Sequence, residues 1–275
     1  MQKNRFRILQ FFFLLLSYSM ISQNYELLWH DEFNTEGKPN PEFWNYETGF
    51  IRNLEKQIYT KRKRNVRVKD GKLEITARRE TYYNKKFNSV IKNYRYNTQF
   101  ANYTSGSIHT RGKIEITYGR IDISAKLPEG KGLWPAIWML GANFKEVAYP
   151  NAGEIDIMEH VGKDSLIIHG TVHYPWDNNT GYKSSTASTS LENPSKQYHL
   201  YSAVWTPEKI DFLVDGKVYH SFKISEAKPE NNPFHKPFYL IINLAVGGNW
   251  PGEIEKDIFP QKLFIDYVRV YKLKK

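Results

Sequence analysis

The 275-residue chain contains no cysteine. This absence excludes disulfide bonds, a thiol nucleophile, a metal site built on thiolates and a lipid anchor attached to cysteine. It does not argue against export, because a chain of this length can bury a sizeable core without disulfide bonds. Stability must therefore come from packing, and any chemistry must come from other side chains.

The sequence also lacks an apolar run long enough to cross a bilayer, which takes about 20 residues. The longest candidate begins at Ile8, is interrupted by Gln10 and ends at Leu16. Basic residues precede it and small residues follow it, which is the pattern of an export signal. We therefore expect a signal peptide over residues 1–22, cleaved after Ser22, and a secreted protein, periplasmic or extracellular, with no stable membrane association after cleavage. An uncleaved anchor is the alternative.

Acidic residues are in the minority. Loss of the signal removes Lys3, Arg5 and Arg7 and leaves 36 Lys and Arg against 29 Asp and Glu, a net charge of +7. Such a surplus could attract nucleic acid, anionic lipid or sulfated polysaccharide. However, the densest run, 61–64, is more typical of a solvated face, and no nucleic-acid-binding motif occurs. We expect no nucleic-acid partner, and we expect a monomer.

Helical patterns are scarce, because hardly any window repeats apolar residues at i, i+3 and i+4. Alternating apolar and polar residues predict β-strands instead, separated by turns such as Asp70-Gly71 and Asp215-Gly216. The clearest alternating segments span residues 72–77, 119–125, 209–214 and 263–271. No linker or repeat divides the chain. The pattern predicts one all-β domain over residues 23–275, an antiparallel two-sheet sandwich.

Three acidic residues crowd one predicted strand within residues 153–162. Glu154 and Asp156 share one face, with isoleucines on the other. Strict alternation would turn Glu159 into the core, where a lone carboxylate is costly to desolvate. We predict a β-bulge at Ile157-Met158, whose extra residue returns Glu159 to the face of Glu154.

With that bulge, the Cα atoms of Glu154 and Glu159 would lie about 13 Å apart. Their carboxyls could then approach the roughly 5–5.5 Å of retaining glycosidases, although spacing alone also allows the about 6.5–9.5 Å of inverting enzymes. A negative Asp156 between them would keep a proton on the acid and orient the nucleophile. The alternatives are a solvated acidic strand and a metal cluster, but the histidine spacing of zinc hydrolases and a calcium loop are both missing.

The segment 154–159, Glu-Ile-Asp-Ile-Met-Glu, resembles the signature of glycoside hydrolase family 16, in the six-residue form of laminarinases, agarases and carrageenases. Other segments resemble further blocks of the family in the same order, namely residues 29–33, 53–60, 132–140, 243–252 and 266–271. The resemblance implies a β-jelly-roll sandwich of the concanavalin A-like type, with an open concave cleft, and a double-displacement mechanism.

The resemblance also implies roles for the acidic residues. By position in the motif, Glu154 is the nucleophile, Glu159 the acid/base and Asp156 their electrostatic partner, with no cofactor needed for catalysis. The laminarinase-like blocks imply an endo-acting hydrolase of β-1,3-glucan. The alternatives are a hydrolase of algal galactans such as agar, carrageenan or porphyran, and a non-catalytic lectin on the same fold. Such lectins typically lose the carboxylates that are present here.

Aromatic residues make up 15% of the chain, more than an ordinary surface needs, and sugar rings stack on aromatic planes. Side chains an even number of residues apart point to the same face of a strand, so Trp134 and Trp138 share one face. By the same rule, Asn53 shares a face with Glu55 and Gln57. Combined with the resemblance, these patterns predict the substrate-binding residues Asn53, Arg111, Trp134, Trp138, His173 and Trp250. The alternative for each is a structural role in the core or at a solvated edge.

Family members often carry a structural calcium ion far from catalysis. The resemblance places its ligands at Glu32, at the carbonyl of Gly71 and at Asp266. Oxygen ligands from strand ends suit Ca²⁺. An ordinary charged rim is the alternative.

Overall fold

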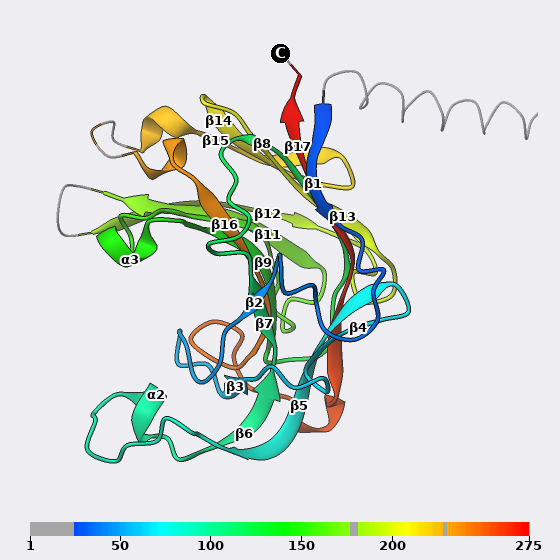
Figure 1. Cartoon of the computed structure of the whole chain (residues 1–275), viewed down its shortest axis with the longest axis vertical. Helices are drawn as coiled ribbons and strands as arrows, with labels where there is room; N and C mark the ends of the chain where they lie inside the picture. The colour runs from blue at the N-terminus through cyan, green and yellow to red at the C-terminus, as the bar shows by residue number, and fades with distance from the viewer. Residues whose placement is uncertain (1–24, 177–180, 228–229, 231, 275) are drawn as a thin grey trace, which may run out of the picture.

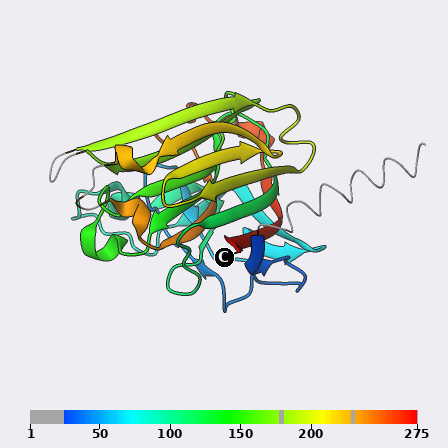
Figure 2. The same cartoon turned by 90° about the horizontal axis from the view of Figure 1, so that it is seen from above.

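The structure, a computed structural model, describes residues 25–176, 181–227, 230 and 232–274. Two β-sheets pack face to face, and the described helices are single turns (Figures 1 and 2). These helices are α2 (Tyr94–Asn97), α3 (Phe144–Val147), η1 (Ile224–Glu226), η3 (Pro233–His235) and η4 (Lys256–Ile258). Within the described ranges, no helix has the length and apolar character needed to span a membrane.

The larger sheet has ten strands, which are β1 (Tyr25–Asp31), β3 (Gln57–Tyr59), β4 (Val66–Lys69), β5 (Lys72–Tyr83), β6 (Phe100–Ser105), β8 (Gly119–Lys126), β13 (His199–Trp205), β14 (Lys209–Val214), β15 (Lys217–Lys223) and β17 (Gln261–Leu273). Their order is β15-β14-β13-β8-β17-β5-β6-β3, with β1 beside β17 and β4 beside β5. Strands β3 and β6 run parallel, whereas the other neighbours in this sheet are antiparallel.

The smaller sheet has seven strands, which are β2 (Asn45–Tyr46), β7 (Ser107–His109), β9 (Leu133–Gly141), β10 (Glu154–Glu159), β11 (Ile167–Pro175), β12 (Tyr182–Ser190) and β16 (Phe238–Val246). Their order is β12-β11-β10-β9-β16-β7-β2, and all these neighbours are antiparallel. Strand β10, which carries the predicted carboxylates, therefore lies inside the sheet between β11 and β9.

The alternating segments form strands where the sequence predicts them. Residues 72–77, 119–125 and 263–271 lie in β5, β8 and β17, and 209–214 is β14. At the two predicted turns, both central residues have positive φ, at Asp70-Gly71 and at Asp215-Gly216. This is the backbone that a tight hairpin turn requires, and glycine adopts it without strain. The predicted all-β sandwich is confirmed.

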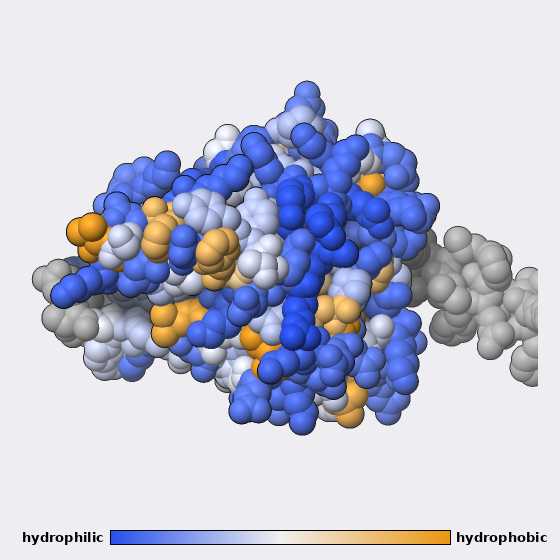
Figure 3. Space-filling view, turned by 90° about the horizontal axis from the view of Figure 1, so that it is seen from below, coloured by the Kyte–Doolittle hydropathy of each residue, from blue (hydrophilic) through white to orange (hydrophobic). Residues whose placement is uncertain are grey.

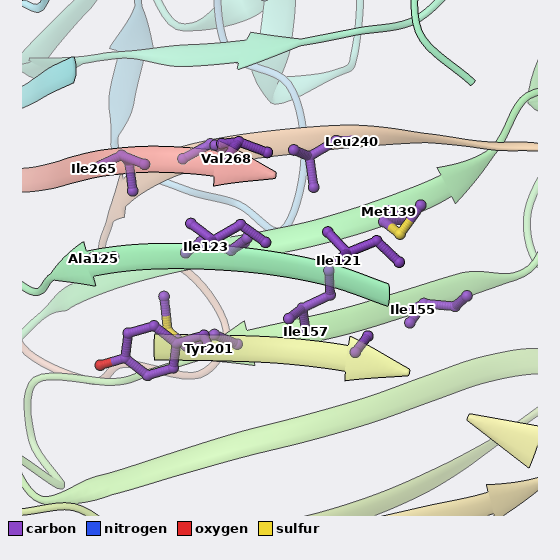
Figure 4. Close-up of a cluster of buried hydrophobic side chains, with 14 of the residues drawn as sticks. Ile121, Ile123, Ala125, Met139, Ile155, Ile157, Tyr201, Leu240, Ile265 and Val268 are labelled. Carbon is purple, nitrogen blue, oxygen red and sulfur yellow. The ribbon is translucent and has the colours of Figure 1, made fainter. Parts of the chain in front are cut away.

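The main core lies between the sheets. Isoleucines and other apolar residues of β8, β9, β10, β13, β16 and β17 interlock there (Figure 4). Ile121, Ile123, Ile155 and Ile157 are each at most 1% exposed. Burying one such side chain stabilises the fold by about 1.5–3 kcal/mol. This layer holds the seven-stranded sheet in place from one side.

Side chains alternate along a strand, so the remaining residues of β9, β10 and β16 lie on the surface of the sheet that faces away from this core. We call that surface the outer face. A second, smaller apolar cluster forms on it, made of Ala136, Trp138, Leu140, Tyr239 and Ile241. The predicted cleft would run over this face.

Candidate active site

The pairing of β10 is irregular at Ile157-Met158. On the β9 side, Glu154 pairs with Leu140 and Glu159 with Ala136, so five steps along β10 match four along β9. The predicted bulge is therefore present. The reason is burial, because Ile157 and Met158 both enter the main core and are fully buried.

The bulge returns Glu159 to the outer face. On the β11 side, Glu154 lies opposite His173 and Glu159 opposite His169, again four steps apart. Asp156 lies between them, opposite Trp138 of the outer-face cluster. The three carboxylates thus share one surface, as the sequence predicts.

These carboxylates sit in a strongly desolvated environment. The side chain of Asp156 is 3% exposed and that of Glu154 is 20% exposed. Burial raises the pKa of Asp156 and of Glu159 to about 8, and it raises the pKa of Glu154 well above its usual range. The negative charge of Asp156 adds to the upward pKa shifts of both glutamates. At neutral pH the site therefore retains protons, and one carboxyl can act as an acid.

His173 faces two of the acids. Its Nε2 lies 3.2 Å from Oδ2 of Asp156 and 3.7 Å from Oε1 of Glu154. The positive form of this imidazole favours ionisation of Glu154 and Glu159. His173, Glu154 and Asp156 offer ligand atoms within 4.8 Å of one another, so these three side chains could also hold a small cation.

An aromatic enclosure surrounds Glu159. The indole Nε1 of Trp134 donates to Oε1 of Glu159 at 3.0 Å. The ring of Trp250 meets Trp134 edge-on, with centroids 5.5 Å apart, and lies 4.9 Å from the ring of His169. Trp134 and Trp250 are half-buried, so part of each ring is open to a ligand. Of the three predicted tryptophans, Trp134 therefore contacts the predicted acid, and Trp250 lies beside Trp134.

Trp138 shares the outer face with Trp134, as predicted, but it is only 7% exposed. Its Nε1 donates to Oδ1 of Asn243 at 2.7 Å, and the guanidinium of Arg52 lies 5.0 Å from its ring centre. Little ring area is left for a sugar. Stacking on Trp138 stays a prediction, whereas its packing in the outer-face cluster is evident.

Arg111 lies in the turn after β7. Its guanidinium is 5.8 Å from the ring centre of Tyr239 in the outer-face cluster. Tyr239 pairs with Leu140, which in turn pairs with Glu154. Arg111 thus reaches the outer face two strands away from the predicted nucleophile.

Asn53 does not lie where strand parity predicts. Strand β3 begins only at Gln57, whereas Asn53 occupies a turn with φ 55°. The shared strand face of Asn53, Glu55 and Gln57 is therefore wrong, because the turn breaks the alternation. Asn53 is exposed, and its carbonyl accepts from the backbone N–H of Asn249 at 3.1 Å. This contact ties the turn to the loop that carries Trp250.

Sequence reasoning missed a polar network beside Trp138. Arg52 forms an ion pair with Glu47, and Ser107 Oγ donates to Glu47 at 2.6 Å. Asn243 donates to the hydroxyl of Tyr59 at 3.1 Å. Asn243 opens a recognisable block, so it could have been found. Glu47 and Arg52 belong to no periodic segment and gave no such signal.

The predicted calcium ligands do not form an obvious cage. Both carboxylate oxygens of Glu32 accept from Arg269 at 2.8 Å, and one also contacts His30 at 3.1 Å. Gly71 is in the turn between β4 and β5, and Asp266 is at an irregularity in β17. A cation at Glu32 would have to share this carboxylate with a guanidinium. The calcium site stays a prediction.

Tryptophans around clustered, desolvated carboxyls on an open sheet face define an enzyme that cleaves glycosidic bonds. Residues 53–269 match the model of glycosyl hydrolases family 16. The chain belongs to this family and is a glycoside hydrolase.

Two relatives illustrate the range of the family. The chain is 41% identical to a β-glucanase of Rhodothermus marinus, covering 90% of this chain and 86% of that protein. It is 34% identical to a keratan-sulfate endo-1,4-β-galactosidase of Sphingobacterium multivorum, covering 94% of this chain but only 58% of that protein.

The similar solved structures likewise come from work on enzymes with different substrates. The laminarinase catalytic domain of Thermotoga maritima is 37% identical, with a TM-score of 0.79 over 92% of this chain and all of that one. A structure from work on mucin-degrading endo-acting O-glycanases of the human gut microbiota is 36% identical, with a TM-score of 0.86 over 91% of both chains.

Proposed function

We propose that this hydrolase cleaves internal β-1,3 bonds of glucan chains with retention of configuration. The observation that supports it most is the bulge in β10, because it sets Glu154, Asp156 and Glu159 on one face. The β-glucanase and laminarinase relatives support β-glucan as the substrate. In this reading no cofactor takes part in catalysis.

In the proposed first step, Glu154 attacks the anomeric carbon while Glu159 gives its proton to the departing glycosidic oxygen. In the second step, Glu159 takes a proton from water, and the resulting hydroxide displaces Glu154 from the sugar. Asp156 stays buried between them, and in its ionised form its charge raises the pKa of Glu159 and so favours the protonated acid. The Trp134 indole holds the Glu159 carboxyl in place.

The half-buried rings of Trp134 and Trp250 would stack on sugar residues next to the bond that is cleaved, and His173 would contact the same region. Asn53 and Arg111, which lie near opposite ends of β16, would bind hydroxyl groups. The substrate would thus lie across β9, β10 and β16.

A second candidate is an endo-β-galactosidase acting on galactose-containing chains. It is favoured by the galactosidase relative and by the O-glycanase structure, whose TM-score of 0.86 exceeds the 0.79 of the laminarinase. Both candidates use the same carboxylates and differ only in the sugars bound beside them.

A substrate panel tests the two candidates. Purified protein is incubated with laminarin, lichenan, agarose, carrageenan and keratan sulfate, and new reducing ends are counted. The first proposal predicts fastest release from laminarin, with the β-anomer formed first in proton NMR. Fastest release from keratan sulfate would favour the galactosidase, and formation of the α-anomer first would contradict retention.

We further propose secretion after removal of residues 1–22, which lie outside the described residues, and a monomeric mature chain of residues 23–275. Mass spectrometry of exported protein would give its first residue, and light scattering its mass. Binding of Ca²⁺ at Glu32, Gly71 and Asp266 is tested by calorimetry with Asp266→Asn as the comparison.

A further inference from the structure

A basic groove lies on the larger sheet, away from the carboxylates. Its cations are Arg64, Arg78, Arg79 and Lys256, which line a depression of about 410 Å³ together with Phe259 and Pro260. They come from the segment before β4, from β5 and from η4. Seen from below, this end of the molecule is mostly hydrophilic, with a band of the most hydrophilic colour beside small hydrophobic spots (Figure 3).

The acids of this groove pair with only two of its four cations. Glu80 pairs with Arg62 and Arg64. Asp257 has a fully exposed side chain, and it contacts Arg79 only at 3.9 Å. An ion pair this exposed to solvent contributes little interaction energy. Among the described residues, neither Arg78 nor Lys256 has an ion-pair partner. Two cationic groups are therefore available to a ligand.

An aromatic ring also lines the groove. Phe259 lines the depression, and its ring lies 5.1 Å from that of Tyr103. Tyr103 lines a neighbouring depression of about 360 Å³, which also includes Arg79 and Lys256. Aromatic rings beside cations suit a sugar that carries an anionic group, because the ring packs on C–H faces while guanidinium and ammonium groups bind the oxyanion.

Shared lining residues link the groove to two neighbouring depressions. Tyr103 also lines a third depression of about 290 Å³, which Leu54 and Lys56 line as well. The N–H of Lys56 donates to the carbonyl of Val246 at 2.8 Å, at the start of the loop that carries Trp250. Lys256 follows Trp250 by six residues, so the two Cα atoms are at most about 20 Å apart. A single chain could contact both regions.

We propose that the basic groove binds an anionic polysaccharide, with sulfate or carboxylate groups, outside the catalytic site. Arg78 and Lys256 bind its anionic groups, and the half-buried ring of Phe259 supports a sugar ring. The site would hold a charged glycan within about 20 Å of Trp250. Binding does not require turnover, so this site is tested whether or not the proposed hydrolase activity holds.

The test uses the mature chain, with dextran sulfate as the probe, neutral dextran as the uncharged comparison, and double-stranded DNA as a second polyanion. Calorimetry at 50 and 150 mM NaCl measures each affinity. Dextran sulfate is expected to bind, more weakly at the higher salt, with dextran silent and DNA at least 10-fold weaker. Absent binding of dextran sulfate, or DNA binding as tightly, would overturn the proposal.

The variant Arg78→Gln/Lys256→Gln is expected to weaken dextran sulfate binding at least 10-fold, and Lys256→Gln alone about 3-fold. The matched control Lys217→Gln/Lys223→Gln removes two exposed charges from β15, at the opposite end of the same sheet. It should leave binding unchanged, and both double variants should keep their activity on neutral laminarin. An equal loss in the control would show diffuse attraction by net charge and would contradict a defined groove.

Discussion

The two faces of strand β10 differ sharply although they alternate along the same six residues. On the inner face, Ile155, Ile157 and Met158 are at most 1% exposed and belong to the main core. On the outer face, burial raises the pKa values of all three acids, and the charge of Asp156 raises those of Glu154 and Glu159 further. Burial of the inner face stabilises the strand. This stabilisation offsets the cost of holding three acidic side chains close together on the outer face.

This comparison implies that changes on the outer face alter rate more than stability, whereas changes on the inner face do the opposite. The largest effect is expected for Glu154→Gln, which removes the proposed nucleophile but keeps the shape of the side chain. Turnover of laminarin should fall by about 10⁵-fold. The melting temperature should stay the same or rise, because a crowded carboxyl is lost. Unaltered turnover would sink the proposed mechanism and favour another nucleophile.

The next largest effect is expected for Glu159→Gln, the proposed acid/base. Turnover should fall by roughly 10²–10⁴-fold, the usual range for a lost general acid. An aryl glycoside with a good leaving group depends less on protonation of the departing oxygen, so its rate of cleavage should fall much less. Azide should restore turnover and give a β-glycosyl azide, seen by NMR. A product of α configuration would reverse the roles of Glu154 and Glu159.

The inner face is tested by Ile155→Ala, which lies between Glu154 and Asp156 but points into the core. It should lower the free energy of unfolding by about 2–5 kcal/mol, measured with urea. Turnover per folded molecule at low temperature should remain within about 3-fold of the parent protein. A large loss of rate with unchanged stability would show that the two faces are not separate.

The pH dependence of stability gives a smaller effect. Because the pKa of Asp156 is raised to about 8, the folded protein keeps a proton that the unfolded chain releases above about pH 4. This carboxyl therefore supports folding at low pH, and that support is lost as the pH rises through 8. Asp156→Asn removes this dependence. The free energy of unfolding of the variant, relative to that of the parent protein, should therefore rise by about 1–3 kcal/mol from pH 4 to pH 8. Urea unfolding at both values measures this, with the exposed Asp70→Asn as a control that should show no trend.

Much of this contrast could be predicted from the sequence. Period-2 patterns are a direct consequence of strand geometry, so β14 is predicted with its observed bounds. The bulge could also be predicted, because only an extra residue keeps Glu159 out of the core while Ile157 and Met158 enter it. The apolar side chains must be buried and the Glu159 carboxylate must stay out of the core, and a bulge satisfies both requirements.

Other parts of the site could not be predicted, for a physical reason. Alternation holds only within a strand, and Asn53 adopts a left-handed turn before β3 begins. Arg52 and Glu47 meet through tertiary packing against Trp138, with no periodic pattern to reveal them. The small exposed area of Trp138 likewise depends on what covers it, not on its parity.

The most direct test of the account is to trap the covalent intermediate. A 2-deoxy-2-fluoro β-glucoside with a good leaving group slows the second step more than the first, so a glycosyl-enzyme should accumulate. Peptide mass spectrometry should then find the sugar on Glu154 and on no other carboxyl. A label on Glu159, or steady release of product of inverted configuration with no label, would contradict the assignment of the outer face.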